Sequence, residues 1–256
     1  MPAIHEAAAA GYQTAAATYA AGRPGYPAEC ETWLREVVGL GAGRSVLDLG
    51  AGTGKFLPCL RRTGARLLAV EPVAAMRSRI ERENHDVMAM AGTATAIPLP
   101  DASVDAVVCA QAFHWFATAE ALAEIRRVLK PAGLLGLIWN VRDESVPWVA
   151  ALTEILDAHE GDAPRYRSAA WRRAFPAEGF AFLGERHARH DHVGPAERVI
   201  VDRAMSVSFI ASLPPDQKAA VMHKVRALIA ATPELAGSGD VALPYDTAMF
   251  AYRRTA

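Results

Sequence analysis

The feature that most constrains this chain is an apolar run that passes directly into a glycine-rich loop. Residues 46–49 (Val-Leu-Asp-Leu) are typical of a buried strand, and Gly50, Gly52 and Gly54 follow directly. Glycine adopts positive φ angles without strain, and its missing Cβ lets the backbone approach a ligand. Open α/β sheets bind ligands at the carboxyl ends of their strands. The segment therefore predicts a ligand-binding loop after a first strand, with a tight turn that binds nothing as the alternative.

Short apolar runs alternate with helical patterns along the first part of the chain. The predicted strands lie at 45–49, 66–70, 87–90, 104–108 and 134–139. The predicted helices lie near 54–63, 73–84 and 118–130. Because each crossover returns over the sheet, this alternation implies a parallel sheet that helices cover on both faces. Further along, helices are predicted near 147–160 and 168–175, strands at 180–193 and 246–253, and a helix-rich stretch at 195–231.

We therefore predict one doubly wound α/β domain over residues 1–256, with a mostly parallel, seven-stranded, Rossmann-like sheet. Within it we expect an N-terminal helical cap at 1–40, a cofactor-binding core at 41–145 and a substrate-side half at 146–256. The substrate-side half would carry edge strands and a helical insertion near the C-terminus that acts as a lid.

The composition disfavours several classes of partner. The formal net charge is -1 and the basic clusters are short pairs such as Arg61-Arg62, whereas nucleic-acid-binding proteins usually present a basic patch. The 3 cysteines are widely spaced without a CxxC pair, which indicates neither a disulfide framework nor a zinc site. No stretch approaches the roughly 18 apolar residues of a membrane helix, and the N-terminus lacks the basic region of a signal peptide. We expect a soluble cytoplasmic protein without nucleic-acid or membrane partners, and the oligomeric state stays open.

An acidic residue follows the second predicted strand. Glu71 lies 21 positions after Gly50 (71 − 50), where a carboxylate can accept hydrogen bonds from both hydroxyls of an adenosine ribose. A dinucleotide fingerprint has a glycine three positions after its second glycine, and this chain has Lys55 there. An NAD-dependent oxidoreductase is therefore the weaker interpretation.

Several further motifs follow in order along the chain. They are Asp48–Gly54, Glu71-Pro72, the stretch from Gly92 to Asp105, Gln111–Phe116 and Arg127–Gly133. Together they resemble the class I S-adenosylmethionine-dependent methyltransferases of the type 11 group, and among these the small-molecule enzymes similar to trans-aconitate methyltransferase. The segment from Tyr19 to Pro27 also resembles that group. The resemblance covers roughly the first 140 residues and is weak beyond them.

The resemblance implies that the protein uses S-adenosyl-L-methionine and releases S-adenosyl-L-homocysteine. Around the methionine part it implies Gly50, Ala51, Gly52, Gln111 and Ala112, with Thr53 as a further cofactor contact. Around the adenine it implies Pro72, Met76, Thr93 and Ala94. It also implies that Asp48 orients the loop through hydrogen bonds, that Glu71 holds the ribose, and that Tyr19 and Arg23 cover the cofactor. Core packing for Met76, and a capping turn for Tyr19 and Arg23, are the alternatives.

Methyl transfer from a sulfonium is an in-line displacement with a neutral leaving group, so alignment contributes most and a general base is optional. We predict that His114, just beyond a strand end, acts as a base or orients the acceptor, with a structural histidine as the alternative. The predicted acceptor contacts are Trp115, Asn140, Arg142 and Phe209. Arg142 would suit an acidic substrate, and an exposed surface arginine is the alternative.

No metal is expected at this site. The run from Gln111 to Phe116 offers no carboxylate at the strand end. His187 is close in sequence to His190 and His192, but alternation along a strand places it on the opposite face from them. The sequence therefore predicts a metal-independent transfer to a small-molecule acceptor. A protein that binds the cofactor and transfers nothing is the second interpretation.

Overall fold

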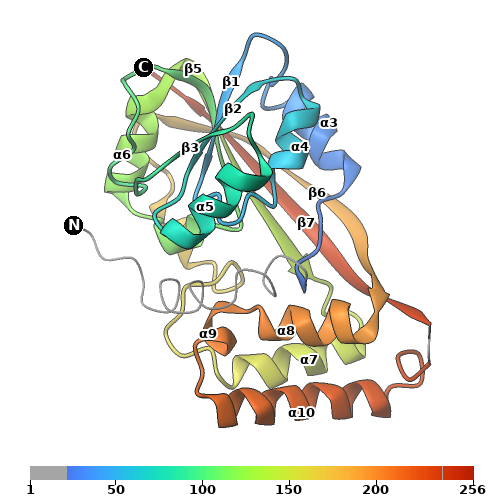
Figure 1. Ribbon diagram of the computed structural model, residues 1–256. Coiled ribbons are helices and arrows are strands. Elements are labelled where there is room, and N and C mark those ends of the chain that lie inside the picture. The colour runs from blue at the N-terminus through green and yellow to red at the C-terminus, as the bar shows by residue number, and fades with distance from the viewer. Residues whose placement is uncertain (1–21, 238) are drawn as a thin grey trace.

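The computed structural model describes residues 22–237 and 239–256, which form a β-sheet with helices on both sides (Figure 1). The strands are β1 (Ser45–Leu49), β2 (Arg66–Val70), β3 (Met88–Met90), β4 (Val104–Ala110), β5 (Leu129–Arg142), β6 (Phe180–Pro195) and β7 (Asp240–Arg254). The α-helices are α3 (Ala28–Glu36), α4 (Leu57–Arg62), α5 (Ala74–Glu83), α6 (Ala119–Val128), α7 (Pro147–Asp157), α8 (Arg203–Met205), α9 (Ser208–Ala211) and α10 (Pro215–Ala231). Short 3₁₀ segments η1 (Phe113–Trp115) and η2 (Ala170–Ala174) and a π-helical segment η3 (Glu197–Asp202) complete the elements.

The seven strands follow the order β3-β2-β1-β4-β5-β7-β6. Strands β1 to β5 pair in parallel, and β7 runs antiparallel to both of its neighbours. The predicted doubly wound, mostly parallel, seven-stranded fold is therefore confirmed. One detail needs correction, because only one of the two late strands is an edge strand. β6 closes the sheet, whereas β7 lies inside it between β5 and β6; strand patterns do not reveal this order.

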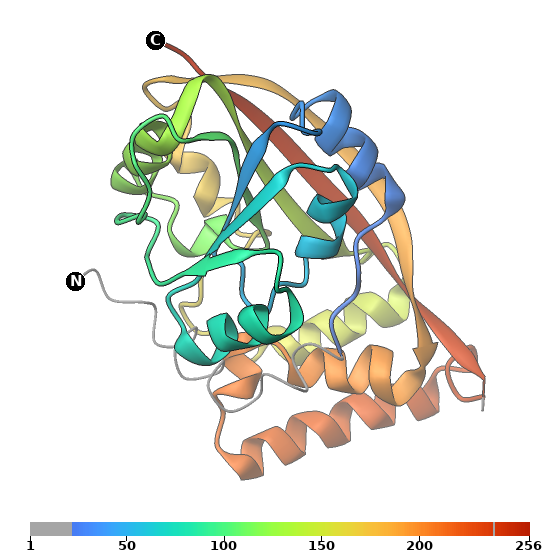
Figure 2. The same cartoon turned by 45° about the horizontal axis from the view of Figure 1, so that its top comes forward.

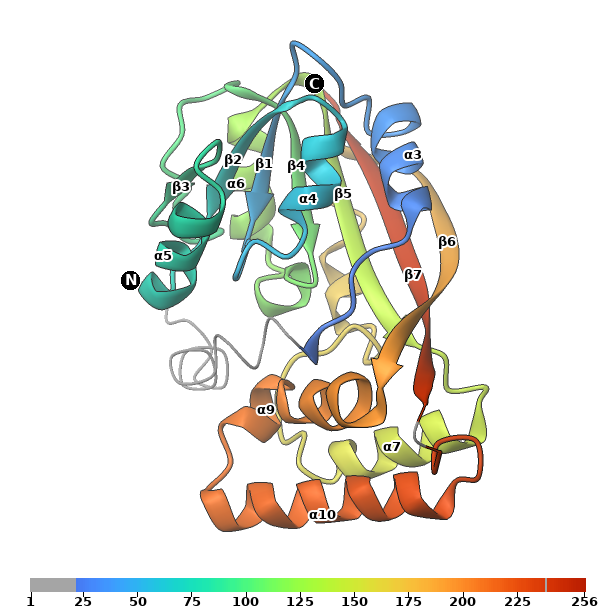
Figure 3. The ribbon, with the colours of Figure 1, turned by 45° about the vertical axis from the view of Figure 1, so that its right-hand side comes forward.

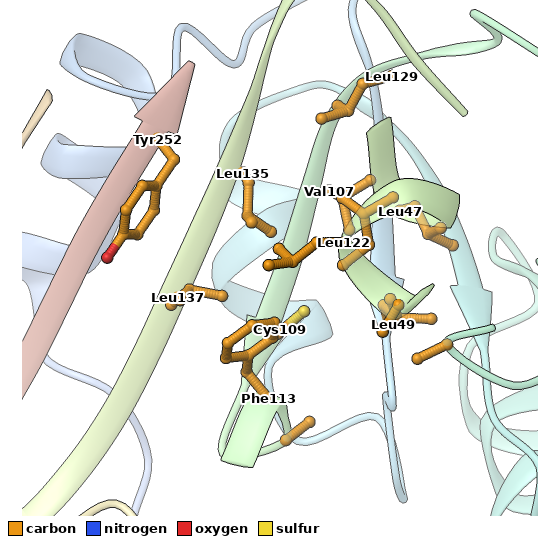
Figure 4. Packing of buried hydrophobic residues seen from close by; sticks show 14 of the residues in the cluster. Leu47, Leu49, Val107, Cys109, Phe113, Leu122, Leu129, Leu135, Leu137 and Tyr252 are labelled. Atoms are coloured by element: carbon orange, nitrogen blue, oxygen red, sulfur yellow. The ribbon is translucent and has the colours of Figure 1, made fainter. Parts of the chain in front are cut away.

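Both faces of the sheet are buried because alternate side chains of the inner strands point to opposite sides. On one face Leu47 of β1 and Leu137 of β5 pack with Leu122 of α6 (Figure 4). On the other face Val46 of β1 packs in a cluster with Trp33 of α3 and with residues of α4. The near-continuous apolar strands of the sequence are thus explained by helices on both sides.

A separate helical layer lies beyond the carboxyl ends of the parallel strands. Helices α7 to α10 gather there, below the sheet in Figures 1 and 3, and the yellow and orange ribbons of Figure 2 show the same layer. Its core joins Leu152 of α7, Ile200 of η3 and Val221 of α10 to Tyr245 at the start of β7. Since η3 to α10 lie between β6 and β7 in the chain, the predicted helical insertion near the C-terminus is confirmed.

The predicted elements are present, but β7 begins at Asp240 instead of the predicted 246, and a shift of similar size lies at the junction of α6 and β5. α6 ends at Val128 and β5 begins at Leu129, earlier than the predicted start at 134. Leu129 already has an extended ψ of 137, and Pro131 lacks the N–H that a continuing helix needs. Lys130 then reaches the carboxylate of Asp105 at 2.9 Å, which fixes this turn beside β4.

The predicted N-terminal cap at 1–40 divides into parts with different positions. Residues 1–21 lie outside the described residues. Residues 22–27 lead to the strand ends, where Arg23 and Tyr26 line a cavity, whereas α3 packs on a face of the sheet through Trp33 and Leu34. In the described part of the chain, no helix is long and apolar enough to cross a membrane.

Candidate functional site

A cavity of about 320 Å³ lies at the carboxyl ends of β1, β2 and β4. Its walls are the loop after β1, the end of β2, the stretch 92–95, the end of β4 with residues 111–112, and Trp115 at the end of η1. Every predicted cofactor contact among the described residues lines this cavity: Arg23, Asp48, Gly50, Ala51, Gly52, Thr53, Glu71, Pro72, Met76, Thr93, Ala94, Gln111 and Ala112. Tyr19 lies outside the described residues. The structure therefore brings these residues together, and their contact with a cofactor stays a prediction.

Gly50 shows why the loop after β1 needs glycine. Its φ is +73, and a Cβ added there would lie 2.8 Å from the Cβ of Ala112. The N–H groups of Gly50 and Ala51 both donate to the carbonyl of Val70, at 2.9 and 3.2 Å. The loop is thus tied to the end of β2 and packed against the end of β4, with its backbone along the cavity.

Glu71 accepts two hydrogen bonds from backbone N–H groups. Its Oε2 accepts from Gly52 N at 2.8 Å and its Oε1 accepts from Val73 N at 2.9 Å. Burial raises the pKa of this carboxyl, against the opposing effect of the Val73 and Gly52 N–H groups. Each carboxylate oxygen has a second lone pair, so Glu71 can hold the glycine loop and still accept from a ligand.

Asp48 is the most unusual polar group of the cavity. It is 1% exposed, and neither carboxyl oxygen has a hydrogen-bond partner among the described residues. Burial, with a contribution from the nearby Glu71 carboxylate, raises the pKa of Asp48 to about 8. The prediction that Asp48 orients the loop through hydrogen bonds is therefore wrong for the described structure. The backbone N–H groups of the loop point to Val70 and Glu71 instead.

Gln111 has a strained backbone at the end of β4. Its φ of +58 is uncommon for a residue with a side chain. Its backbone N–H donates to Ile138 O at 2.8 Å, and its Nε2 donates to Asn140 O at 3.2 Å. These bonds to β5 hold the backbone in its strained conformation, and such strain is a common feature of functional sites.

Met76 of α5 is 2% exposed and lines the cavity, so packing and ligand contact are compatible at this position.

The stretch 22–27 is held against the strand ends by the side chain of Asn140. Asn140 Nδ2 donates to Gly25 O at 2.8 Å, and Asn140 Oδ1 accepts from Thr247 Oγ1 at 2.7 Å. Arg23 Nη2 donates to Ser206 O at 3.1 Å, which links this stretch to the inserted helices. Arg23 is therefore fixed between the sheet and the helical layer, at the edge of the cavity.

A second cavity of about 100 Å³ adjoins the first. Arg23, Gln111, Trp115, Asn140 and Arg203 line both cavities. All predicted acceptor contacts line the second: Trp115, Asn140, Arg142 and Phe209. Arg142 is 8% exposed, so the alternative of an exposed surface arginine is wrong.

Three cationic residues of this second cavity were not predicted from the sequence: Arg165, Arg167 and Arg203. Arg203 begins α8, and Arg165 stacks on the Phe209 ring at 5.0 Å. None of the three belongs to a motif, and the fold brings them to Arg142 from distant parts of the chain. No local signal in the sequence marks Arg203, because the stretch before it already carries the charged residues Glu197, Arg198 and Asp202.

His114 also lines the second cavity, where it accepts a hydrogen bond from a buried tryptophan. Trp139 Nε1 donates to His114 Nδ1 at 3.0 Å. Indole nitrogen can only donate, so Nδ1 carries no proton and the neutral ring carries its proton on Nε2. Burial, with the positive charges of Arg165 and Arg23, lowers the pKa of His114 to about 3. The ring is a hydrogen-bond donor through Nε2 and a poor base.

The histidines of β6 do not form a metal cluster. His187 lies between Glu185 at 2.7 Å and Asp246 at 2.5 Å, whereas His190 stacks on Tyr245. Among the described residues, no group of three or more His, Cys, Asp or Glu side chains is arranged to hold a metal ion.

Fold and cavity together define a Rossmann-like α/β protein with a ligand cavity at its strand ends. A family model described as a methyltransferase domain matches residues 47–137. An uncharacterized methyltransferase-like protein of Schizosaccharomyces pombe is 37% identical over 245 residues, which cover 93% of each chain. An uncharacterized methyltransferase of Mycobacterium tuberculosis is 39% identical over 236 residues, which cover 92% of each chain.

These relatives match the protein over nearly its whole length, and the chain therefore belongs to the class I methyltransferase family. The fold agrees with a solved structure from Anaeromyxobacter dehalogenans that is named as a candidate type II methyltransferase. That structure superposes with a TM-score of 0.67 at 23% identity and covers 91% of this chain and 97% of its own. The finer resemblance to trans-aconitate methyltransferase stays a prediction.

Proposed function

We propose that the protein transfers a methyl group from S-adenosyl-L-methionine to a small-molecule acceptor, without a metal ion. The observation that carries this proposal is the pairing of the glycine loop after β1 with Glu71 at the end of β2. Glu71 binds Gly52 N at 2.8 Å, and both residues line the 320 Å³ cavity. Family membership supports the same conclusion.

The residues of the first cavity fit this cofactor. Glycine at position 50 lets the loop backbone lie close against Ala112 at the end of β4, along the wall of the cavity. Glu71 would accept from the ribose hydroxyls through the lone pairs that the backbone does not use. Pro72, Met76 and Ala94 would give the adenine apolar contacts. The carboxyl of Asp48 has no hydrogen-bond partner among the described residues, and a cationic ligand beside it would favour its ionised form and be stabilised by it in turn.

The cofactor would supply an electrophilic methyl group whose leaving sulfur departs neutral, so the protein needs no general acid. Its residues would mainly align the acceptor and exclude water. Trp115 provides an aromatic wall where the two cavities meet, and Phe116 provides one in the first cavity. We propose that His114 orients the acceptor by donating from Nε2, since its Nδ1 is occupied by Trp139 and its pKa of about 3 makes it a poor base.

Two further parts of the proposal concern the acceptor and the metal. The second cavity of about 100 Å³ suits a compact group rather than a macromolecule. The strand end from Gln111 to Phe116 offers no carboxylate ligand, which supports transfer without a metal.

Calorimetric titration with S-adenosylmethionine, S-adenosylhomocysteine and NAD tests the cofactor assignment. Hydrogen bonds to a charged group contribute about 1.5–3 kcal/mol each, so Glu71→Gln should weaken binding of both sulfur ligands at least about tenfold. Glu81→Gln, on the exposed side of α5, is the matched control and should bind as the wild type does. Binding of NAD alone, or unchanged affinity in Glu71→Gln, would contradict the proposal.

A further inference from the structure

The second cavity is strongly cationic. Arginines at five positions line it, and Glu144 is its only acidic lining residue within the described part of the chain. These arginines come from four different segments: Arg23, Arg142, Arg165 and Arg167, and Arg203. Convergence of like charges from distant segments costs electrostatic energy, which a bound anion would offset.

Arg142 carries the clearest uncompensated charge. It is 8% exposed, it donates one hydrogen bond from Nε to Thr153 Oγ1 at 3.2 Å, and it has no ion pair among the described residues. Burial, with the positive charges of Arg203 and Arg165, lowers the pKa of Arg142 to about 10. The guanidinium thus stays charged at neutral pH although it is buried beside other cations. A buried charge without a counter-ion is unfavourable, so this position indicates a missing anionic partner.

Arg203 adds a second cation at the junction of the two cavities. Its Nε donates to Tyr245 Oη at 3.1 Å and its Nη1 lies 3.5 Å from Ser206 Oγ. Both partners are neutral hydroxyls, and Arg203 has no ion pair within residues 22–237 and 239–256. Its place in the lining of both cavities puts it beside the first cavity, where the methyl group would be delivered.

Two of the other arginines, Arg165 and Arg167, are partly compensated by acidic side chains. Arg165 lies 3.4 Å from Glu160 and 3.9 Å from Asp157. Arg167 lies 2.7 Å from Asp157. Of the four arginines other than Arg23, only Arg142 and Arg203 therefore lack an ion pair among the described residues, and Arg203 lies where the two cavities meet.

We propose that the methyl acceptor carries a carboxylate or phosphate group that Arg142 and Arg203 bind in the second cavity. Guanidinium groups bind both kinds of anion through paired N–H donors. Anchoring the anion there would leave the rest of a small acceptor directed toward the first cavity, past Trp115. This inference rests on the proposed function, because the bound anion is an acceptor only if the protein transfers a methyl group. The anion site itself can be tested separately.

The test is titration calorimetry on protein loaded with S-adenosylhomocysteine, in a buffer of low ionic strength without phosphate or sulfate. Three probes are compared: glutarate for a carboxylate, glycerol 3-phosphate for a phosphate, and glutaramide as an uncharged match for glutarate. We expect one or both anions to bind at least tenfold more tightly than glutaramide. Preference for one anion assigns the source of the charge, and equal binding assigns a site that accepts both.

The variants are Arg142→Met and Arg203→Met, which keep an apolar side chain and remove the charge. Each should weaken anion binding at least tenfold. Arg142 does not line the first cavity, so Arg142→Met should keep its affinity for S-adenosylhomocysteine, which also verifies its folding. Arg253→Met, exposed at the opposite end of β7, is the control and should bind the anions as the wild type does.

Anions that bind no better than glutaramide, or anion binding that survives in both variants, would overturn the inference while leaving cofactor binding intact. If Arg142→Met does not fold, Arg203→Met alone decides the test, because Arg203 is only half-buried and its replacement should not prevent folding. Failure of the protein to bind S-adenosylhomocysteine would instead overturn the proposed function. In that case the ligand-free protein is titrated with the same anions and variants, and the arginine site is decided on those results.

Discussion

Replacing Asp48 by asparagine should stabilise the ligand-free protein at neutral pH, by an amount that depends on pH. The carboxyl is 1% exposed and has no hydrogen-bond partner among the described residues. Burial and the nearby Glu71 raise its pKa from 3.8 to about 8. The folded state therefore keeps a proton on Asp48 at pH values where the unfolded chain has lost it.

The size of the effect follows from this difference. Between pH 4 and pH 8 the unfolded state binds fewer protons at this position, so the free energy of unfolding falls by about 1.4 kcal/mol for each pH unit. The stability linked to protonated Asp48 is complete below pH 3.8 and is lost as pH rises toward 8. At pH 7 the loss amounts to about 4 kcal/mol, and at pH 5 to about 1–2 kcal/mol. Asparagine does not titrate, so Asp48→Asn avoids this loss.

Urea denaturation of wild type and Asp48→Asn at pH 5 and pH 7 measures the effect. The difference in unfolding free energy between the two proteins should grow by about 2–3 kcal/mol from pH 5 to pH 7 in favour of the variant. Asp216→Asn, at the exposed start of α10, controls for the change of residue type. An equal difference at both pH values would refute the assignment of a raised pKa to Asp48.

Three further predictions concern the loop, the sheet and the edge strand. Gly50→Ala should destabilise the protein by about 2–4 kcal/mol in urea denaturation and reduce cofactor binding at least tenfold. The reason is that φ at position 50 is +73 and the new Cβ would lie 2.8 Å from the Cβ of Ala112. The control Gly41→Ala, where a Cβ meets open space, should have neither effect. Asp105 accepts hydrogen bonds from Lys130, Arg44 and Ser45, which hold its pKa below the ordinary value although burial opposes them. Asp105→Asn should lower the free energy of unfolding by about 2–3 kcal/mol at pH 7, and this difference should shrink as acid protonates the wild-type carboxyl. Denaturation at pH 7 and at pH 3 measures the two values. Hydrogen bonds to Glu185 and Asp246 raise the pKa of the half-exposed His187, so the stabilisation by its charged form should be full below pH 6.5 and be lost as pH rises through the raised pKa. His187→Gln should therefore lower the stability by less than about 1 kcal/mol at pH 6 and by less still at pH 9. Thermal denaturation at the two pH values measures this difference.

The parts of the structure that the sequence predicted depend on short-range patterns. The strand from Ser45 to Leu49 was identifiable from its apolar run, and the loop after it was identifiable from glycines, which the local backbone conformation requires. Glu71 was identifiable because a parallel sheet brings the ends of neighbouring strands to one edge, whatever the intervening helix contains. The cofactor side of the protein was predictable for this reason.

The parts that the sequence did not predict depend on contacts between distant segments. The missing hydrogen bonds of Asp48 follow from the loop donors pointing to Val70 and Glu71 instead. The tautomer of His114 is set by Trp139, which lies 25 positions away. Arg203 reaches Arg142 only because the helices between β6 and β7 fold back over the strand ends. Neither spacing nor periodicity carries information of this kind.

The helical insertion leaves and re-enters the sheet at two paired positions. Pro195, the last residue of β6, is the register partner of Asp240, the first residue of β7. Paired residues of antiparallel strands lie about 5 Å apart, so the sheet requires only that the two ends of the insertion meet. The length and sequence of 196–239 can therefore change in evolution while every strand keeps its register. Such a change would exchange Arg203 and leave Arg142 in place, which makes the segment a unit through which acceptor choice can diverge without altering the cofactor half.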